Sequence, residues 1–206
     1  MSALSQLIQE VKACTRCELA SSRLNAVPGE GPEDASIAFI GEAPGFHENR
    51  QGRPFVGPAG QFLEELLASI GLKREQVYIA NVVKCRPPEN RDPLPGEIEA
   101  CRPFLDRQLA IIKPRLVVTL GRYSMARYFP GASISRIHGV ARREGSVFYL
   151  PMYHPAAALH QPALRQSIEK DMLKIPELMA ELQKMAEAPQ VAEEPKPSQP
   201  EQLSLF

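Results

Sequence analysis

The sequence predicts an α/β fold, a three-layer sandwich in which helices flank a central four-stranded parallel sheet. Short apolar runs rich in Val, Ile, Phe and Tyr alternate along the chain with segments that have helical spacing of apolar residues. Strands that alternate with helices in this way form parallel sheets covered on both faces. With 206 residues, 44% of them hydrophobic, the chain is long enough for one core of ordinary size.

In the first half of the chain, a helix is expected first, because apolar residues recur at positions 4, 7, 8 and 11. A strand follows at 36–40. Apolar residues at helical spacing predict a second helix over 62–70, which ends at Gly71 because glycine commonly terminates helices. The next apolar run predicts a strand at 77–83.

In the second half, Leu94-Pro95 opens a helix over 98–112, since proline is tolerated in a first helical turn. Strands are expected at 115–120 and 147–152. The last helical pattern covers 164–185, and Pro176 is expected to break or kink it. Residues 1–185 are therefore expected to form the folded domain.

Residues 186–206 differ in composition from the rest of the chain. They are rich in proline and glutamate, and the only aromatic residue among them is Phe206. Such a segment cannot bury enough apolar surface to offset its ordering entropy. We expect a disordered linker that ends in a short apolar peptide.

The charge balance is uneven along the chain. Lys plus Arg and Asp plus Glu both total 24, but residues 81–143 hold 12 basic and 5 acidic side chains, a net charge of +7. This segment suggests a basic face for an anionic partner, although scattered solvated arginines would give the same count. The chain lacks an apolar run of about 20 residues and a signal peptide pattern, so a cytoplasmic protein is expected.

Polar and aromatic side chains follow three of the expected strands. Glu42 and Phe55 follow the first strand, Asn81 lies at the end of the second, and His154 follows the fourth. Ligands of open parallel sheets bind beyond the carboxyl ends of the strands. An amide can read the hydrogen-bonding edge of a heterocycle, a phenyl ring can stack on it, and an imidazole can donate to a developing oxyanion.

Four cysteines are present in a chain expected to occupy a reducing compartment. Cys14 and Cys17 have chelating spacing, whereas Cys85 and Cys101 have 15 residues between them in the sequence. A metal site is favoured over disulfides there. Four thiolates suit either a tetrahedral zinc ion or an iron-sulfur cluster, and the sequence leaves both open.

Taken together, these motifs resemble the family 4, iron-sulfur branch of the uracil-DNA glycosylase superfamily. The resemblance runs from Cys14 to about residue 165 and includes GEAPG at 41–45, GRPFVGPAG at 52–60, NVVKCRPPENRDPLPGE at 81–97 and HP at 154–155. It implies a 4Fe-4S cluster on Cys14, Cys17, Cys85 and Cys101. The implied activity is hydrolysis of the bond between uracil and deoxyribose, the first step of base excision repair.

The resemblance also implies roles for individual residues. Phe55 would stack on a uracil flipped out of DNA, Asn81 would read its amide edge, and His154 would stabilise the uracil anion. Glu42 would help to place the attacking water. Glu48 would line the pocket where the methyl group of thymine would fall.

Main-chain groups around Ala43 would complete this pocket. Other superfamily members have an aspartate near this position that activates water, which an alanine cannot do. A mechanism led by departure of the uracil anion is therefore expected.

Uracil-containing DNA, single or double stranded, is the expected partner, and the protein is expected to be a monomer located with the nucleoid. Lys84, Arg86 and Arg91 would hold phosphates. Members of the superfamily insert an apolar wedge from the loop that corresponds to residues 156–161, and Leu159 is the candidate here.

The chain ends in a peptide that resembles the one by which bacterial repair proteins dock on the sliding clamp. Its expected contact residues are Gln202, Leu203, Leu205 and Phe206. Two other functions stay open from the sequence: a glycosylase for another deaminated base, and a non-catalytic nucleic-acid-binding protein with structural zinc.

Overall fold

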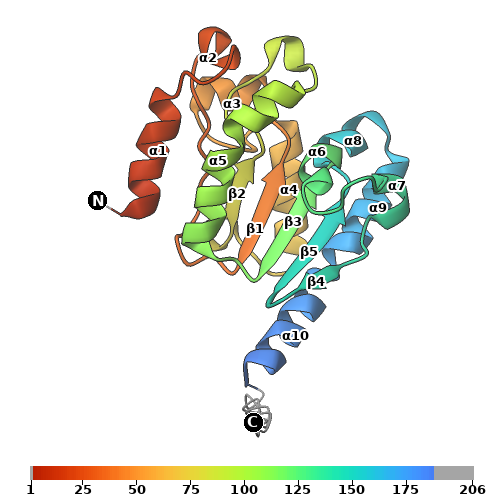
Figure 1. Cartoon of the computed structure of the whole chain (residues 1–206). Coiled ribbons are helices and arrows are strands. Elements are labelled where there is room, and N and C mark those ends of the chain that lie inside the picture. Colours follow the sequence, from red (N-terminus) through yellow and green to blue (C-terminus); the bar gives the residue numbers. More distant parts are fainter. Residues whose placement is uncertain (1, 188–206) are drawn as a thin grey trace, which may run out of the picture.

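A computed structural model of the chain describes residues 2–187. Its single sheet has the strand order β2-β1-β3-β5-β4 (Figure 1). The first four of these strands are parallel, which confirms the predicted parallel sheet. The fifth, β4, is a short antiparallel edge strand that pairs with β5. Its three residues are charged and exposed, so it has no apolar alternation by which the sequence could reveal it.

The strands are β1 (Ile37–Gly41), β2 (Tyr78–Asn81), β3 (Leu116–Leu120), β4 (Arg142–Glu144) and β5 (Val147–Met152). The longer helices are α1 (Ala3–Ala13), α4 (Pro58–Ser69), α5 (Pro95–Ile112), α9 (Ala163–Met172) and α10 (Ile175–Glu187). The short helices are α2 (Leu19–Ser22), α3 (Phe46–Gln51), α6 (Arg122–Ala126), α7 (Ile134–Ile137) and α8 (Pro155–His160), and two 3-10 turns lie at Arg74–Gln76 and Pro88–Asn90.

The core has two halves, one on each face of the sheet. Side chains alternate along β1, so that Phe39 faces one half while Ala38 and Ile40 face the other. One half packs against α4, α9 and α10, and the other against α1 and α5. Figure 1 shows α5 in front of the sheet with α1 beside it at the left, and α4 and α9 behind the sheet. The predicted three-layer sandwich is confirmed.

The last predicted helix is divided in two, as the position of Pro176 predicts. α9 ends at Met172, and α10 begins at Ile175 with the proline in its first turn, where the missing N–H costs nothing. α10 continues to Glu187, two residues past the expected domain end. The predicted linker over 188–206 and its terminal peptide lie outside the described residues. Among the helices within 2–187, none has the length and apolarity that crossing a membrane requires.

Candidate active site

A pocket of about 450 Å³ lies at the carboxyl ends of the parallel strands. The segments after β1, β2 and β5 form its walls, as expected for an open α/β sheet. A cavity of about 700 Å³ lies elsewhere, along α5, so composition rather than size distinguishes this pocket. Its lining residues are Glu42, Ala43, Pro44, Gly45, Glu48, Phe55, Ala59, Asn81, Pro87, Asn90, Arg91, His154, Ala156, Ala157 and His160.

Asn81, the last residue of β2, is 2% exposed. Its Oδ1 atom has no hydrogen-bond partner among the residues that the structure describes. A buried acceptor without a donor costs stability, so a ligand donor is its expected partner. Gly41 makes this placement possible, because a Cβ there would lie 2.4 Å from Asn81 Oδ1 and 2.7 Å from the Phe55 ring. No pattern in the sequence indicates this role of Gly41.

Phe55 has a left-handed backbone with φ +51°, which is unusual for a bulky residue. Two features hold it there. Arg74 donates to the carbonyl oxygen of Phe55 at 2.8 Å and also to that of Pro54. Gly60 packs directly on the Phe55 carbonyl, where a Cβ would come within 2.0 Å of the oxygen. Backbone strain held by its surroundings is common at functional sites.

His154 lies in the pocket wall with its ring nearly parallel to that of Phe55, at a centroid distance of 5.4 Å and an angle of 23°. Burial lowers its pKa to about 4, so the ring is neutral at pH 7. Its Nδ1 atom accepts a hydrogen bond from the Ala156 amide at 3.1 Å. The ring proton must then lie on Nε2, which leaves His154 as a hydrogen-bond donor.

Glu42 follows β1 and lines the same pocket. Burial raises its pKa to about 7, with a further contribution from the Asp92 carboxylate, while Arg122 opposes the shift. Arg122 forms an ion pair with Asp92. A carboxyl group with a pKa near neutrality can hold or take a proton at physiological pH, a common property of active-site residues.

The pocket thus joins an unpartnered amide, an imidazole donor, a phenyl ring and a shifted carboxyl group. Comparison with known proteins agrees with this chemistry, because the model of the uracil DNA glycosylase superfamily matches residues 28–175. The chain belongs to the uracil DNA glycosylase superfamily.

Relatives within this superfamily are similar over most of their length. The chain is 49% identical to the Type-4 uracil-DNA glycosylase of Sulfurisphaera tokodaii, an alignment that covers 86% of each protein. It is 47% identical to the Type-4 enzyme of Archaeoglobus fulgidus, over 89% of this chain and 96% of the relative. With the Type-4 enzyme of Saccharolobus solfataricus the identity is 44%, over 87% and 88%.

Glu48, predicted to line the glycosylase pocket, does so, but its oxygens already have donors. Oε1 accepts from the amides of Val56 at 2.9 Å and Gly57 at 3.0 Å, and Oε2 accepts from that of Gly45 at 3.1 Å. This carboxylate therefore fixes the backbone on two sides of the pocket. Its contacts indicate a positioning role instead of a direct catalytic one.

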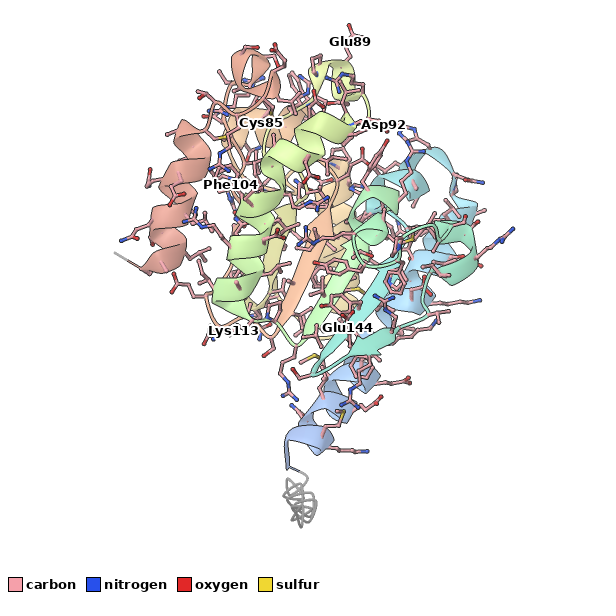
Figure 2. All side chains as sticks on the ribbon, viewed as in Figure 1. Cys85, Glu89, Asp92, Phe104, Lys113 and Glu144 are labelled. Atoms are coloured by element: carbon pink, nitrogen blue, oxygen red, sulfur yellow. The ribbon has the colours of Figure 1, made fainter. Side chains whose placement is uncertain are left out.

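The four cysteines of this superfamily member line one small cavity beside α1 and α5. Cys14 and Cys17 follow α1, Cys85 follows β2, and Cys101 lies on α5. Figure 2 labels Cys85 in this part of the molecule. Within residues 2–187, no three His, Cys, Asp or Glu side chains are placed to hold a single metal ion. Four thiolates are a ligand set that both a tetrahedral Zn²⁺ and an iron-sulfur cluster accept.

Three of the four sulfurs accept hydrogen bonds from N–H groups. The donors are the Arg16 amide to Cys14 at 3.5 Å, the Arg23 side chain to Cys85 at 3.2 Å, and the Lys84 amide to Cys101 at 3.3 Å. N–H donors of this kind stabilise the negative charge of ligating thiolates. The donor set and its surroundings therefore fit an iron-sulfur cluster.

The prediction that Lys84 binds phosphate is wrong. Its side chain is 1% exposed, and its Nζ atom donates to the carbonyl of Asn81 and to Gln108 Oε1, both at 2.7 Å. Burial lowers its pKa to about 8. Lys84 cannot reach DNA, and it instead supports the end of β2 from behind.

The other residues predicted to contact DNA, Arg86, Arg91 and Leu159, are at least partly exposed. Arg91 lines the pocket and is exposed, although Glu97 pairs with it at 2.6 Å. Arg86 is half-buried and its guanidinium lies 5.4 Å from the Phe46 ring. Leu159 on α8 is 49% exposed. The roles of Arg86, Arg91 and Leu159 stay predictions.

Proposed function

We propose that this protein removes uracil from DNA by hydrolysing its N-glycosidic bond, which leaves an abasic site and begins base excision repair. The observation that carries this function is the convergence of Phe55, Asn81 and His154 on one pocket, with Asn81 Oδ1 unpartnered within the described chain. The named relatives are uracil-DNA glycosylases. This similarity favours uracil excision over another deaminated base and over a non-catalytic zinc protein.

Base selection follows from the Asn81 amide. Uracil presents an N3–H donor beside its O4 acceptor, which matches Oδ1 and Nδ2 of an asparagine. Cytosine has an acceptor at N3 and an amino group at C4, so both contacts would fail. A site built on hydrogen bonds strongly rejects a base that leaves its buried groups unpaired. Phe55 stacks on the base and holds it in register.

Bond cleavage follows from His154 and Glu42. As the N1–C1′ bond breaks, its electron pair moves onto the uracil ring, and His154 donates Nε2–H to the O2 atom where charge develops. Water adds its oxygen to C1′ and gives up a proton, and uracil takes a proton after departure. Glu42 orients this water. Ala43 lines the pocket but cannot act as a base, so departure of the anion leads the reaction.

The four cysteines, Cys14, Cys17, Cys85 and Cys101, would hold a 4Fe-4S cluster. Bound there, it would tie α1 to the segment between β2 and α5 and so support the pocket without taking part in the chemistry. Anaerobic purification tests this assignment. A brown protein with iron and sulfide is expected, and a colourless protein with one zinc would overturn it.

DNA, single or double stranded, is the proposed substrate, held at phosphates by Arg86 and Arg91. Leu159 would fill the gap that the flipped uracil leaves in a duplex. Location with the nucleoid and a monomeric state are proposed with this function.

The C-terminal peptide is proposed to dock on the bacterial sliding clamp through Gln202, Leu203, Leu205 and Phe206. The preceding segment would raise the local concentration of the enzyme on clamped DNA. Deleting the last five residues should abolish clamp binding and leave excision from a short free duplex intact. Loss of both together would contradict this division.

A panel of oligonucleotides tests the main proposal. Each carries one uracil, thymine, hypoxanthine or xanthine, in single or double strands, and single-turnover release of the base is measured. Uracil should be released fastest and thymine not at all. Faster release of hypoxanthine or xanthine than of uracil would reassign the substrate, and no release of any base would overturn the enzymatic function.

A further inference from the structure

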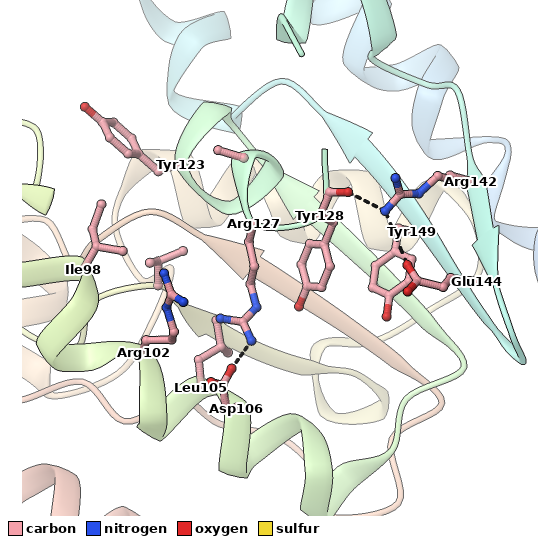
Figure 3. A pocket seen from close by; sticks show the side chains of 12 residues that line it. Ile98, Arg102, Leu105, Asp106, Tyr123, Arg127, Tyr128, Arg142, Glu144 and Tyr149 are labelled. Atoms are coloured by element: carbon pink, nitrogen blue, oxygen red, sulfur yellow. Dashed lines mark hydrogen bonds and ion pairs between the residues drawn. The ribbon is translucent and has the colours of Figure 1, made fainter. Parts of the chain in front are cut away.

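Two adjoining cavities form a groove along α5, on the face of the sheet opposite α4. α5 forms one wall and the β4–β5 hairpin forms the other (Figure 3). The cavities share Asp106, Arg127, Tyr128 and Tyr149, and the larger has a volume of about 700 Å³. The proposed uracil pocket has none of these residues in its lining.

The groove contains much of the positive charge that the sequence concentrates in residues 81–143. Five of the 12 basic residues of that segment line it, against two acidic residues, for a net charge of +3. The uracil pocket is lined by one arginine or lysine of that segment, Arg91. The basic residues of the groove are Arg102, Lys113, Arg115, Arg127 and Arg142, and the acidic ones are Asp106 and Glu144.

Aromatic rings are interleaved with these charges. The rings of Tyr128 and Tyr149 are stacked with centroids 4.4 Å apart, and the Arg127 guanidinium lies 5.5 Å from the Tyr128 ring. The Tyr128 hydroxyl is buried and has no hydrogen-bond partner within the described chain. Aromatic platforms beside cations are how proteins bind single-stranded nucleic acid without sequence preference.

Three of the four groove arginines pair with carboxylates: Arg102 with Glu99, Arg127 with Asp106 and Arg142 with Glu144. Figure 3 shows Arg127 directed at Asp106 on α5 and Arg142 beside Glu144. The Arg142–Glu144 pair has an N···O distance of 3.4 Å and both side chains are exposed. Exposed ion pairs contribute about 0–1 kcal/mol. A phosphate of bound DNA can therefore replace the carboxylate. Before DNA binds, the ion pair keeps each guanidinium group in the groove.

One end of the groove lies beside the uracil pocket. Tyr123 lines the groove, and the preceding Arg122 pairs with Asp92, whose charge acts on Glu42 in the pocket. Lys113 and Glu144 lie at the far end of the sheet in Figure 2, whereas Asp92 lies at the pocket end. A strand that leaves the pocket can therefore continue into the groove.

We propose that this groove binds the single-stranded continuation of the DNA strand that carries the uracil. Bases stack on the tyrosines, and phosphates meet Arg127 and Arg142. A duplex hides its bases and presents only phosphates, so it cannot use the tyrosines. That the bound strand is the one with the uracil rests on the proposed glycosylase function. That the groove binds single-stranded nucleic acid rests on the residues of the groove alone.

The double variant Arg127→Gln/Arg142→Gln tests this groove. Its matched control is Arg107→Gln, which also removes an α5-associated exposed ion pair, with Glu10, but lies outside the groove. Anisotropy measures the binding of uracil-free single strands of about 15 nucleotides at several salt concentrations. The double variant should bind about 10-fold more weakly. Its salt slope should fall by about 1.4, from about 0.7 for each lost phosphate contact.

Arg107→Gln should leave both quantities unchanged, and both proteins should keep the unfolding temperature of the wild type, which shows that they fold. Unchanged affinity and slope in the double variant would overturn the proposal, as would an equal loss on duplex DNA. Lost binding of polyglutamate with unchanged DNA binding would assign the groove to an acidic protein instead. Because these strands lack uracil, failure of the proposed glycosylase function would be a separate result.

Discussion

The uracil pocket leaves one buried acceptor without a donor among the described residues, whereas the cysteine cavity supplies N–H donors to three of its four sulfurs. In the pocket, Asn81 Oδ1 lacks a partner within the described chain, and Phe55 is held in a left-handed conformation. In the cavity, the sulfurs of Cys14, Cys85 and Cys101 accept N–H donors. An unsatisfied group or a strained backbone costs stability but is available to a ligand. Pocket variants should therefore lose rate without losing stability, and cysteine variants the reverse.

The largest expected effect is on the rate, at Asn81 and His154. Asn81→Ala and His154→Ala should each lower single-turnover excision of uracil by about 10²–10³-fold, because each removes a hydrogen bond that the transition state needs. The unfolding temperature of Asn81→Ala should stay the same or rise, since the change removes an unpaired buried acceptor.

Thr119→Val provides the matched control for Asn81→Ala. Thr119 Oγ1 is also buried and unpartnered within residues 2–187, but it lies in β3 and outside the pocket lining. This variant should be more stable and fully active. Near-normal excision by both pocket variants would remove the site assignment.

The second effect is on stability, at the cysteine cavity. Cys101→Ser should remove the brown colour and lower the free energy of unfolding by about 2–3 kcal/mol, or about 5–10 °C in the unfolding temperature. Calorimetry on anaerobic samples measures this change. At low temperature the folded fraction should still excise uracil. A variant with an unchanged free energy of unfolding but no activity would give the cluster a direct catalytic role. The proposed difference between the pocket and the cysteine cavity would then be wrong.

The third effect tests the close packing behind the pocket. A Cβ on Gly41 would meet Asn81 Oδ1 and the Phe55 ring, so Gly41→Ala should lower excision by about 10–100-fold through displacement of both. Gly96→Ala is the control, because nothing lies within 4 Å of a Cβ at that position. Equal rates for the two variants would show that the pocket adjusts to the added methyl group.

The sequence could predict the convergence of the site because topology decides it. The parallel sheet brings Glu42, Asn81 and His154 to one edge once the strands are placed, and placing strands needs only apolar runs. The edge strand β4 was not predicted because its three residues are charged and exposed, so they form no apolar run.

Other features depend on neighbours that are distant in the sequence. Lys84 looks like a phosphate ligand beside Arg86, yet Gln108, 24 residues away, accepts its ammonium group inside the core. The need for glycine at positions 41 and 60 likewise arises from distances between segments, not from local pattern. The pKa of Glu42 is raised mainly by burial, and the burial of a side chain cannot be read from the local sequence.

The fourth effect is a pH dependence set by Glu42. With its pKa raised to about 7, this carboxyl is charged above pH 7 and protonated below it. If the carboxylate orients water, wild-type excision should fall as the pH drops below 7 and level off about 10-fold lower, near the rate of a protein with a neutral side chain at this position. The neutral His154, with a pKa of about 4, adds no second loss until far lower pH. Glu42→Gln should be about 10-fold slower at pH 8, with a flat profile between pH 5 and 8.

The raised pKa of Glu42 should make stability fall as the pH rises, whereas it makes the excision rate increase. Between pH 4.5 and 7 the folded state binds more protons at Glu42 than the unfolded state does, so its contribution to stability falls as pH rises through this range. Glu42→Gln lacks this loss and should be more stable than the wild type at pH 8. Denaturant unfolding at pH 5 and pH 8 measures the difference. A wild-type profile that is flat in both rate and stability would mean that Glu42 is not the titrating group.

The smallest effect on excision is expected at Leu159, which has neither an unpartnered buried group nor a contact with the cysteine sulfurs. Leu159 is 49% exposed on α8, and a side chain that fills the gap in a duplex adds contact area only after the base has flipped. Leu159→Ala should therefore slow excision from duplex DNA by about 3–10-fold, the equivalent of about 1 kcal/mol of lost contact, and leave single-stranded excision unchanged. Leu173→Ala, which removes a leucine that is 56% exposed at the end of α9, is the control. An equal loss of rate on single strands would mean that Leu159 supports His154 instead of filling the gap in the duplex. The strained region with the unpartnered acceptor would then extend from the pocket along α8.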